Sequence, residues 1–188
     1  MRPLGLVLFS LALPTLAVAG SVKVDRSHSG VMFQAHHFGA GYTWGRFNDF
    51  SGQVDCSPDG STLTSLDITV QASSIDSGIE KRDKHLRSPD FLNVDAHPTI
   101  TFKSTKAEKA GDKTWKVSGD LSLHGVTRPV EAMVEVTGVI GNPVQKKAGF
   151  EAVFEIKRSD FGMDWGVKNK ALGDNVKMVV GLEGDWKR

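Results

Sequence analysis

Arg82 and His85 are the two residues of this chain whose types and spacing point most directly to binding chemistry. They lie three positions apart, so one face of a helix would present both side chains together. A guanidinium group can fork onto a phosphate or quinone oxygen, and an imidazole can donate beside it. The same stretch contains Arg87, Asp83 and Asp90, which would form ion pairs that only fix the segment in place. A polar binding site and a structural cluster therefore both stay open.

The remaining histidines do not match the spacing of a metal site. His36 and His37 are adjacent, so on a strand they point to opposite faces and cannot hold one ion together. His37 shares a strand face with Phe33, which predicts a hydrogen-bonded histidine in the core. Cys56 is the single cysteine, and its place two residues after Val54 predicts a small buried side chain. We therefore predict no metal and no cofactor.

Catalytic motifs are absent from the sequence. The chain has no Gly-x-Ser-x-Gly elbow, no Walker loop and no dinucleotide fingerprint. The glycines of Gly39–Gly41 precede Tyr42 and suit a turn between strands better than a phosphate cradle. A pair assembled by folding, such as Asp76 with His85, has no positive support. We predict that the protein is not an enzyme.

The first residues predict export. Arg2 provides a positive start, Leu4–Leu16 form an apolar run, and Ala17–Ala19 match a small-x-small cleavage site. The run is too short for a membrane-spanning helix, which needs about 20 apolar residues. The sequence therefore predicts a cleaved signal peptide at residues 1–19, one domain at residues 20–188, and a periplasmic protein without a stable membrane span.

The charge balance limits the class of partner. The chain contains 23 basic and 22 acidic side chains. Nucleic acids and anionic membrane surfaces favour clustered positive charge, so the balance argues against either as the main partner, and we predict no nucleic-acid partner. An apolar stripe on an exposed strand edge would allow a homodimer, although nothing in the pattern demands one.

Period-two alternation of apolar and polar residues predicts an all-β fold. Val31, Phe33 and Ala35, for example, share one strand face. Eight or nine such segments follow one another with short turns, which favours an antiparallel barrel because closure removes exposed edges. Several segments, such as 129–138 and 149–158, exceed eight residues and predict a tall barrel. Such a barrel can fill its interior with side chains or hold one extended ligand.

One stretch, residues 78–93, breaks the alternation and predicts a short helical insert over one end of the barrel. Asp76 or Ser77 can cap its start. A second start is predicted at Ser88, with Pro89 at the first helical position.

Five segments carry a family resemblance that covers nearly the whole chain in order. They are His28–Phe33, Gly45–Gly52, Arg82–Leu92, Gly119–Val130 and Arg158–Met163. These segments resemble the YceI-like family of periplasmic polyisoprenoid-binding proteins. The resemblance implies a lipocalin-like antiparallel β-barrel of about eight strands with an apolar pocket. It further implies binding, storage or transport of a long-chain isoprenoid or similar amphiphilic lipid, such as a polyprenyl phosphate or a quinone-like molecule.

With that resemblance, inward-facing apolar residues become candidates for the wall of a ligand tunnel. The predicted lining is Phe33, Phe47, Leu66, Ile68, Phe102, Val117, Leu121, Val134, Phe154 and Val180. Arg82 and His85 become candidates for contacts with the lipid head group. Two alternatives stay open: a filled barrel that acts as a stress-protective or interaction module, and a quinone-linked redox accessory.

Overall fold

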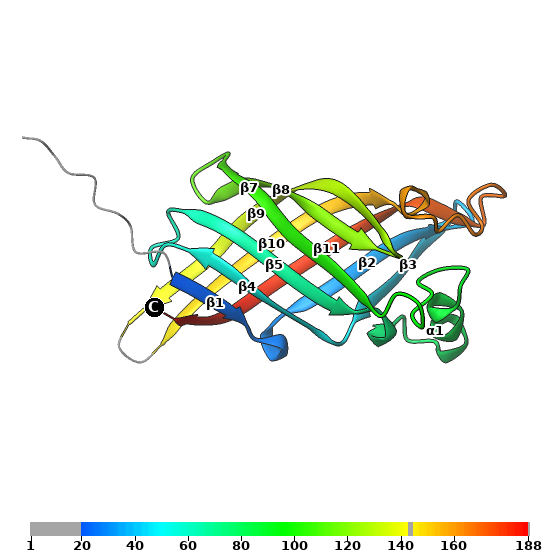
Figure 1. The fold of residues 1–188 in the computed structure, drawn as a ribbon, viewed down its shortest axis with the longest axis horizontal. Helices are drawn as coiled ribbons and strands as arrows, with labels where there is room; N and C mark the ends of the chain where they lie inside the picture. The colour runs from blue at the N-terminus through cyan, green and yellow to red at the C-terminus, as the bar shows by residue number, and fades with distance from the viewer. Residues whose placement is uncertain (1–19, 143–144, 188) are drawn as a thin grey trace, which may run out of the picture.

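Strands make up most of the chain in the computed structural model, which describes residues 20–142 and 145–187 (Figure 1). The predicted signal peptide, residues 1–19, lies outside these described residues. The strands are β1 (Gly20–Val24), β2 (Gly30–His37), β3 (Gly41–Phe47), β4 (Phe50–Cys56), β5 (Leu63–Gln71), β6 (Ile75–Asp76), β7 (Thr99–Lys109), β8 (Thr114–Leu123), β9 (Val126–Gly141), β10 (Lys146–Lys157) and β11 (Leu172–Lys187). Helix α1 spans Glu80–Arg87, and short 3-10 segments span Arg26–His28, Ala72–Ser74 and Arg158–Phe161. Within the described ranges, no helix is long and apolar enough to cross a membrane.

The sheet closes on itself as an eight-stranded antiparallel barrel, which confirms the predicted fold class. Neighbouring strands follow the order β1–β4–β5–β7–β8–β9–β10–β11. Residues Gly184–Lys187 of β11 pair with β1, and the preceding part, Leu172–Gly181, pairs with β2. Strand β11 therefore closes the ring through β1 at one end, and at the other end it pairs with β2 of the β2–β3 hairpin.

Alternation sorts the side chains as the sequence predicts. Val31, Phe33 and Ala35 of β2 are buried inside the barrel, whereas Met32 between them is exposed on its outer face. Cys56 is also buried, as predicted, and burial raises the pKa of its thiol above the ordinary value. The two-residue alternation along each strand thus determines which side chains face the interior of the barrel.

One end of the barrel is filled by side chains. The indole rings of Trp115 and Trp186 lie there among the buried Val22, Val54 and Cys56. This is the end at which β1 begins and β11 finishes (Figure 1). The lumen at this end is therefore a packed core that includes these two wide rings.

The start of helix α1 differs from the prediction. Its N-cap residue is Ile79, which makes no capping hydrogen bond through its side chain, so the predicted cap at Asp76 or Ser77 is wrong. Asp83 reaches back from the first turn instead. Its carboxylate accepts hydrogen bonds from the Ser77 backbone N–H at 2.8 Å and from the Ser77 hydroxyl at 2.5 Å. Asp83 is buried, so this bond fixes the entry to the helix from within it.

The predicted second helical start at Ser88 is also wrong. Residues 88–96 form successive turns, in which the N–H groups of Phe91 and Asn93 both donate to the Ser88 carbonyl, at 3.0 and 2.9 Å. The turns place Phe91 and Leu92 over the end of the barrel, where both are buried. Packing against the end of the barrel therefore determines the conformation of residues 88–96.

Closure by β11 depends on a close backbone approach at Gly184. A Cβ atom at this position would overlap the backbone oxygen of Lys23 on β1, whereas a Cβ at Gly181 would meet nothing within 4 Å. We expect Gly184→Ala to lower the free energy of unfolding by about 1–3 kcal/mol through overpacking. The matched substitution Gly181→Ala should have little effect in the same urea titration. Equal effects of the two substitutions would contradict this account of closure.

Candidate functional site

A cavity of about 190 Å³ occupies the lumen beyond the filled end. Its wall is formed by residues of the barrel strands, the α1 segment and the 158–172 segment. All of its lining residues are apolar except Glu151 and Arg158. The wall therefore presents almost only carbon to anything inside, which suits a hydrocarbon and offers little to a polar molecule.

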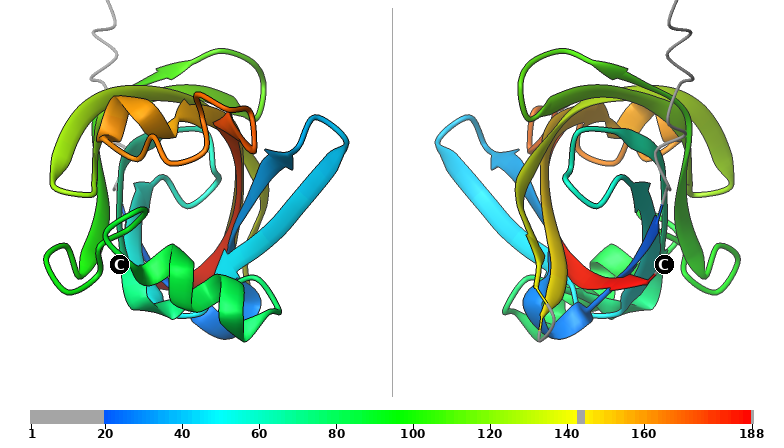
Figure 2. Two further views of the ribbon diagram at one scale, coloured as in Figure 1. Left: turned by 90° about the vertical axis from the view of Figure 1, so that its right-hand side faces the viewer. Right: turned by 90° about the vertical axis from the view of Figure 1, so that its left-hand side faces the viewer.

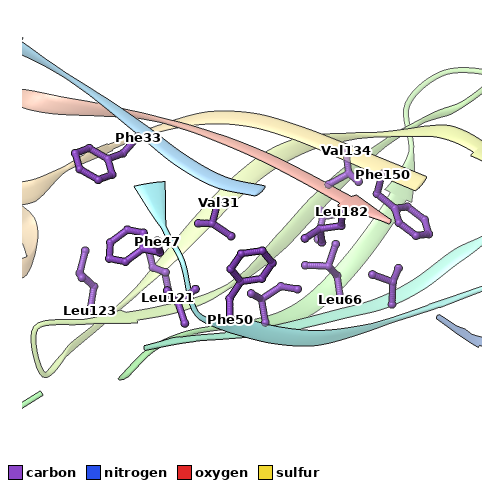
Figure 3. Close-up of a cluster of buried hydrophobic side chains, with 14 of the residues drawn as sticks. Val31, Phe33, Phe47, Phe50, Leu66, Leu121, Leu123, Val134, Phe150 and Leu182 are labelled. Carbon is purple, nitrogen blue, oxygen red and sulfur yellow. The ribbon is translucent and has the colours of Figure 1, made fainter. Parts of the chain in front are cut away.

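All ten residues predicted to line a tunnel border this cavity. Figure 3 shows Phe33, Phe47, Leu66, Leu121 and Val134 pointing into the lumen from different strands. That these side chains contact a ligand stays a prediction.

Several inward side chains are only partly buried, and this marks the hollow part of the lumen. Phe102, Phe154 and Val180 take inward positions yet are half-buried, whereas Trp115 and Val117 nearer the filled end are almost fully buried. Because all three half-buried residues line the cavity, the surface they leave uncovered faces it.

Two segments cap the end of the barrel opposite the filled end (Figure 2). The first cap is α1 with the turns after it, and it contributes Leu86, Phe91 and Leu92 to the cavity wall. The second cap is the segment 158–172, which contributes Met163 and Leu172. Both caps thus turn apolar side chains inward and extend the carbon wall of the barrel.

Arg158 holds the second cap in place and was missed by the sequence analysis. It is only 3% exposed. Its guanidinium group donates to the backbone oxygens of Met163 at 2.7 Å, Leu172 at 2.9 Å and Gly173 at 2.9 Å. The sequence did contain a signal, because Arg158 continues the inward series of Phe154 and Ile156. A charge at an inward position calls for dedicated partners, which here are three carbonyl groups.

The charge of Arg158 has no ion-pair partner within the described part of the chain. Burial lowers the pKa of its guanidinium, and the more distant carboxylates of Asp174 and Asp164 act in the opposite direction. The guanidinium carbon lies 5.8 Å from the ring centroid of Phe91, which belongs to the first cap. Arg158 therefore connects both caps.

An aromatic cluster also joins the two caps. The ring centroid of Trp165, on the second cap, lies 4.9 Å from that of His85 and 5.4 Å from that of Phe91. His85 and Phe91 are themselves 4.9 Å apart, and His85 Nε2 lies 2.9 Å from a carboxylate oxygen of Asp90. These rings form the seam along which the caps meet.

Arg82 and His85 are not among the residues that line the cavity within the described chain. Arg82 donates from Nε to the Ser77 hydroxyl and from Nη2 to the Ser77 backbone oxygen, both at 2.6 Å. Arg87 donates to the backbone oxygens of Ser73 and Ile75. The arginines thus bind hydroxyl and carbonyl groups instead of the carboxylates considered from the sequence. The head-group role of Arg82 and His85 stays a prediction.

The histidines do not converge on a metal site in the described ranges, where no group of three His, Cys, Asp or Glu side chains lies close enough to hold an ion. His97 and His124 have ring centroids 5.0 Å apart, and His124 Nδ1 lies 2.9 Å from the Phe161 carbonyl oxygen.

The prediction of a core position for His37 is wrong. This residue ends β2 and is exposed, because the strand runs past the packed wall.

Comparison with known proteins gives one consistent family. A family model described as a YceI-like domain matches residues 22–184. Protein YceI of Salmonella arizonae is 36% identical over 187 residues, which cover 96% of this chain and 95% of that protein.

Two solved structures share the barrel. BcnA of Burkholderia cenocepacia has a TM-score of 0.76 at 26% identity, covering 86% of this chain and 99% of BcnA. A domain from Saccharophagus degradans, described as a polyisoprenoid binding domain implicated in plant cell wall breakdown, has a TM-score of 0.69. At 17% identity, over 91% of this chain and 99% of that domain, this likeness shows the fold.

Loss of Arg158 should loosen the second cap. Arg158→Gln would leave buried carbonyl groups of the cap without donors, so we expect the free energy of unfolding to fall by about 3 kcal/mol in urea titration. Arg128→Gln is the matched control, because Arg128 is exposed and donates to one carbonyl, at 3.2 Å. A change below about 1 kcal/mol for Arg158→Gln would show that the cap does not depend on this side chain.

Proposed function

The chain belongs to the YceI-like family, and we propose that it binds a long isoprenoid chain or similar amphiphilic lipid in the barrel cavity. The observation that carries the proposal is the cavity wall, in which every lining residue except Glu151 and Arg158 is apolar. Burial of hydrocarbon contributes roughly 25 cal/mol for each Å² removed from water. A long chain can therefore bind well without a strong polar contact.

The size of the cavity bears on how a long chain enters. About 190 Å³ is less than the roughly 300 Å³ at the lower end of ligand pockets. A long isoprenoid therefore needs wall side chains or a cap to move aside. Met163 and Met178 both line the cavity, and their flexible thioether side chains can adapt to a new shape. Binding is then a partition of the chain into a dry lumen, with no covalent step.

The described function of the Saccharophagus domain, polyisoprenoid binding, agrees with the proposal, although that likeness at 17% identity shows the fold alone. The space inside the barrel counts against the filled-barrel alternative. The signal peptide predicted at residues 1–19 supports a further part of the proposal, that the lipid is stored or transported in the periplasm.

The polar end of the lipid would stay near the caps. The cavity wall offers a polar group few partners, and a buried polar group without a partner is costly. The isoprenoid tail would then point toward Trp115 and Trp186, and the head group would lie at the seam of the caps. Arg82 and His85 lie on α1 in the first cap, where they would meet such a head group.

Filling part of the cavity should weaken binding. Ala152 lines it between Val134 and Val180, so Ala152→Phe places a ring in the lumen. We expect the affinity for a fluorescent geranylgeranyl probe to fall about tenfold, a loss of ~1.4 kcal/mol. Val153→Phe, one residue along the strand and on the outer face, is the matched control. Equal affinities of the two variants would contradict binding in the lumen.

The head-group proposal has its own test. Arg82→Ala should weaken binding of a polyprenyl phosphate while binding of the corresponding neutral polyprenol is unchanged, because only the phosphate gains from a guanidinium. The affinities of both lipids are measured by titration, and a circular dichroism melt checks the fold. An unchanged ratio of the two affinities would remove Arg82 from the head-group site.

A further inference from the structure

Large aromatic side chains are exposed at the capped end of the barrel. Phe38 is 67% exposed, Tyr42 62%, Trp44 52% and Trp165 44%. We call these four residues the aromatic rim. Scattered single apolar residues on a surface need no explanation, but a gathering of large exposed rings beside the caps of a cavity marks an interaction site.

The β2–β3 hairpin carries three of the four rim residues and projects from the barrel wall (Figure 2). Strand β3 pairs with β6 only through Arg46 and Phe47, so its first residues extend beyond the wall. The hairpin is joined to the second cap, because the Phe38 N–H donates to the Ala171 carbonyl at 3.1 Å. The rim residue Trp165 lies on that cap, so the whole rim belongs to one end of the molecule.

The backbone conformation of Phe38 indicates that its exposed side chain has a function. Phe38 has φ of 48°, in the left-handed region that glycine and asparagine adopt far more readily than a bulky residue. The conformation is unfavourable for phenylalanine, and exposure of its ring to water is unfavourable as well. Neither contributes to the packing of the barrel, so both point to a partner that covers the ring.

The charges around the rim differ from those of the whole chain. Residues 36–46 and 163–172 contain the exposed Lys168 and Lys170 and a single carboxylate, Asp164, while Arg46 is paired with Asp76 at 3.4 Å. The chain as a whole is nearly balanced, with 23 basic and 22 acidic side chains. Lys168 and Lys170 are exposed beside Trp165 in the sequence of the second cap. Tryptophan and tyrosine with nearby lysines are the side chains that favour the boundary between lipid and water.

We propose that the aromatic rim docks the barrel onto the surface of a lipid bilayer that contains anionic lipids. This inference rests on the proposed function, because a carrier of isoprenoid chains must exchange them with a membrane. A bilayer is favoured over a protein partner by the combination of the rim, the exposed Lys168 and Lys170, and the place of both beside the caps.

Docking would act directly on the seam of the caps. Trp165 contacts both His85 and Phe91 across that seam. Transfer of the Trp165 ring into the lipid would withdraw these contacts and part the caps. The isoprenoid chain could then pass between the bilayer and the lumen without crossing water.

Vesicle flotation tests the proposal. The probe is vesicles of phosphatidylethanolamine and phosphatidylglycerol, and the variants are Phe38→Ser with Trp165→Ser, and Ile140→Ser as control. Ile140 is 47% exposed but lies on β9 away from the caps. We expect the fraction of floated protein to fall at least fivefold for the double variant and to match the parent for the control. Equal flotation of all three proteins would overturn the proposal, as would a rim that mediates only self-association in light scattering.

Tryptophan fluorescence gives a second, independent readout. Trp44 and Trp165 belong to the rim, whereas Trp115 and Trp186 are 2% and 8% exposed at the filled end. Vesicles made with brominated lipids should quench the first pair, and the quenched component should disappear in the double variant Trp44→Phe with Trp165→Phe. Quenching that persists in this variant would contradict docking through the rim.

Failure of docking and failure of the proposed function can be told apart. Uptake of the fluorescent geranylgeranyl probe is measured in the absence of vesicles. A parent protein that takes up the probe but neither floats nor shows quenching overturns the docking inference alone. A parent protein that takes up no probe overturns the proposed function, and the docking inference with it.

Discussion

Closure of eight strands into a ring determines how much space the inward side chains must fill. At one end Trp115 and Trp186 are buried in the core and help to fill it. The cavity wall includes Ala35, Ala132 and Ala152, whose short side chains leave part of the lumen unfilled. The cavity is therefore a consequence of side-chain size along the inner face. The proposed binding site depends on this combination of short and long inward side chains more than on any single residue.

The two caps cover the end of the lumen opposite the filled end (Figure 2). Arg158 binds the backbone carbonyls of Met163 and Leu172 in the second cap and of Gly173 directly after it, and Phe91 of the first cap lies against its guanidinium. A charge is thus kept next to an apolar cavity without a carboxylate partner among the described residues, which is tolerable because carbonyl groups surround it. In the proposed function, a ligand would enter where the aromatic seam of His85, Phe91 and Trp165 parts, while the hydrogen-bonded barrel wall stays intact.

Much of the wall could be predicted from the sequence, and the reason is geometric. Alternation assigns each strand residue to a face, so the inward positions of Phe33, Leu66 and Val180 follow from the order of residues alone. Which inward residues touch each other across the ring could not be predicted, because that depends on distances set by closure. For the same reason the role of Arg158 was missed. The error at His37 arose because β2 extends past the packed wall, and the errors around α1 arose because tertiary contacts shape that segment.

The central claim is that the lumen holds an isoprenoid chain, and extraction of the native protein tests it most directly. The protein is purified from its natural host without detergent, extracted with organic solvent and examined by mass spectrometry, next to a sample boiled before purification. The account predicts a prenyl lipid or quinone in a ratio near one per protein in the native sample only. An empty extract, together with no uptake of added prenyl lipids, would contradict the claim and favour a filled barrel with another role.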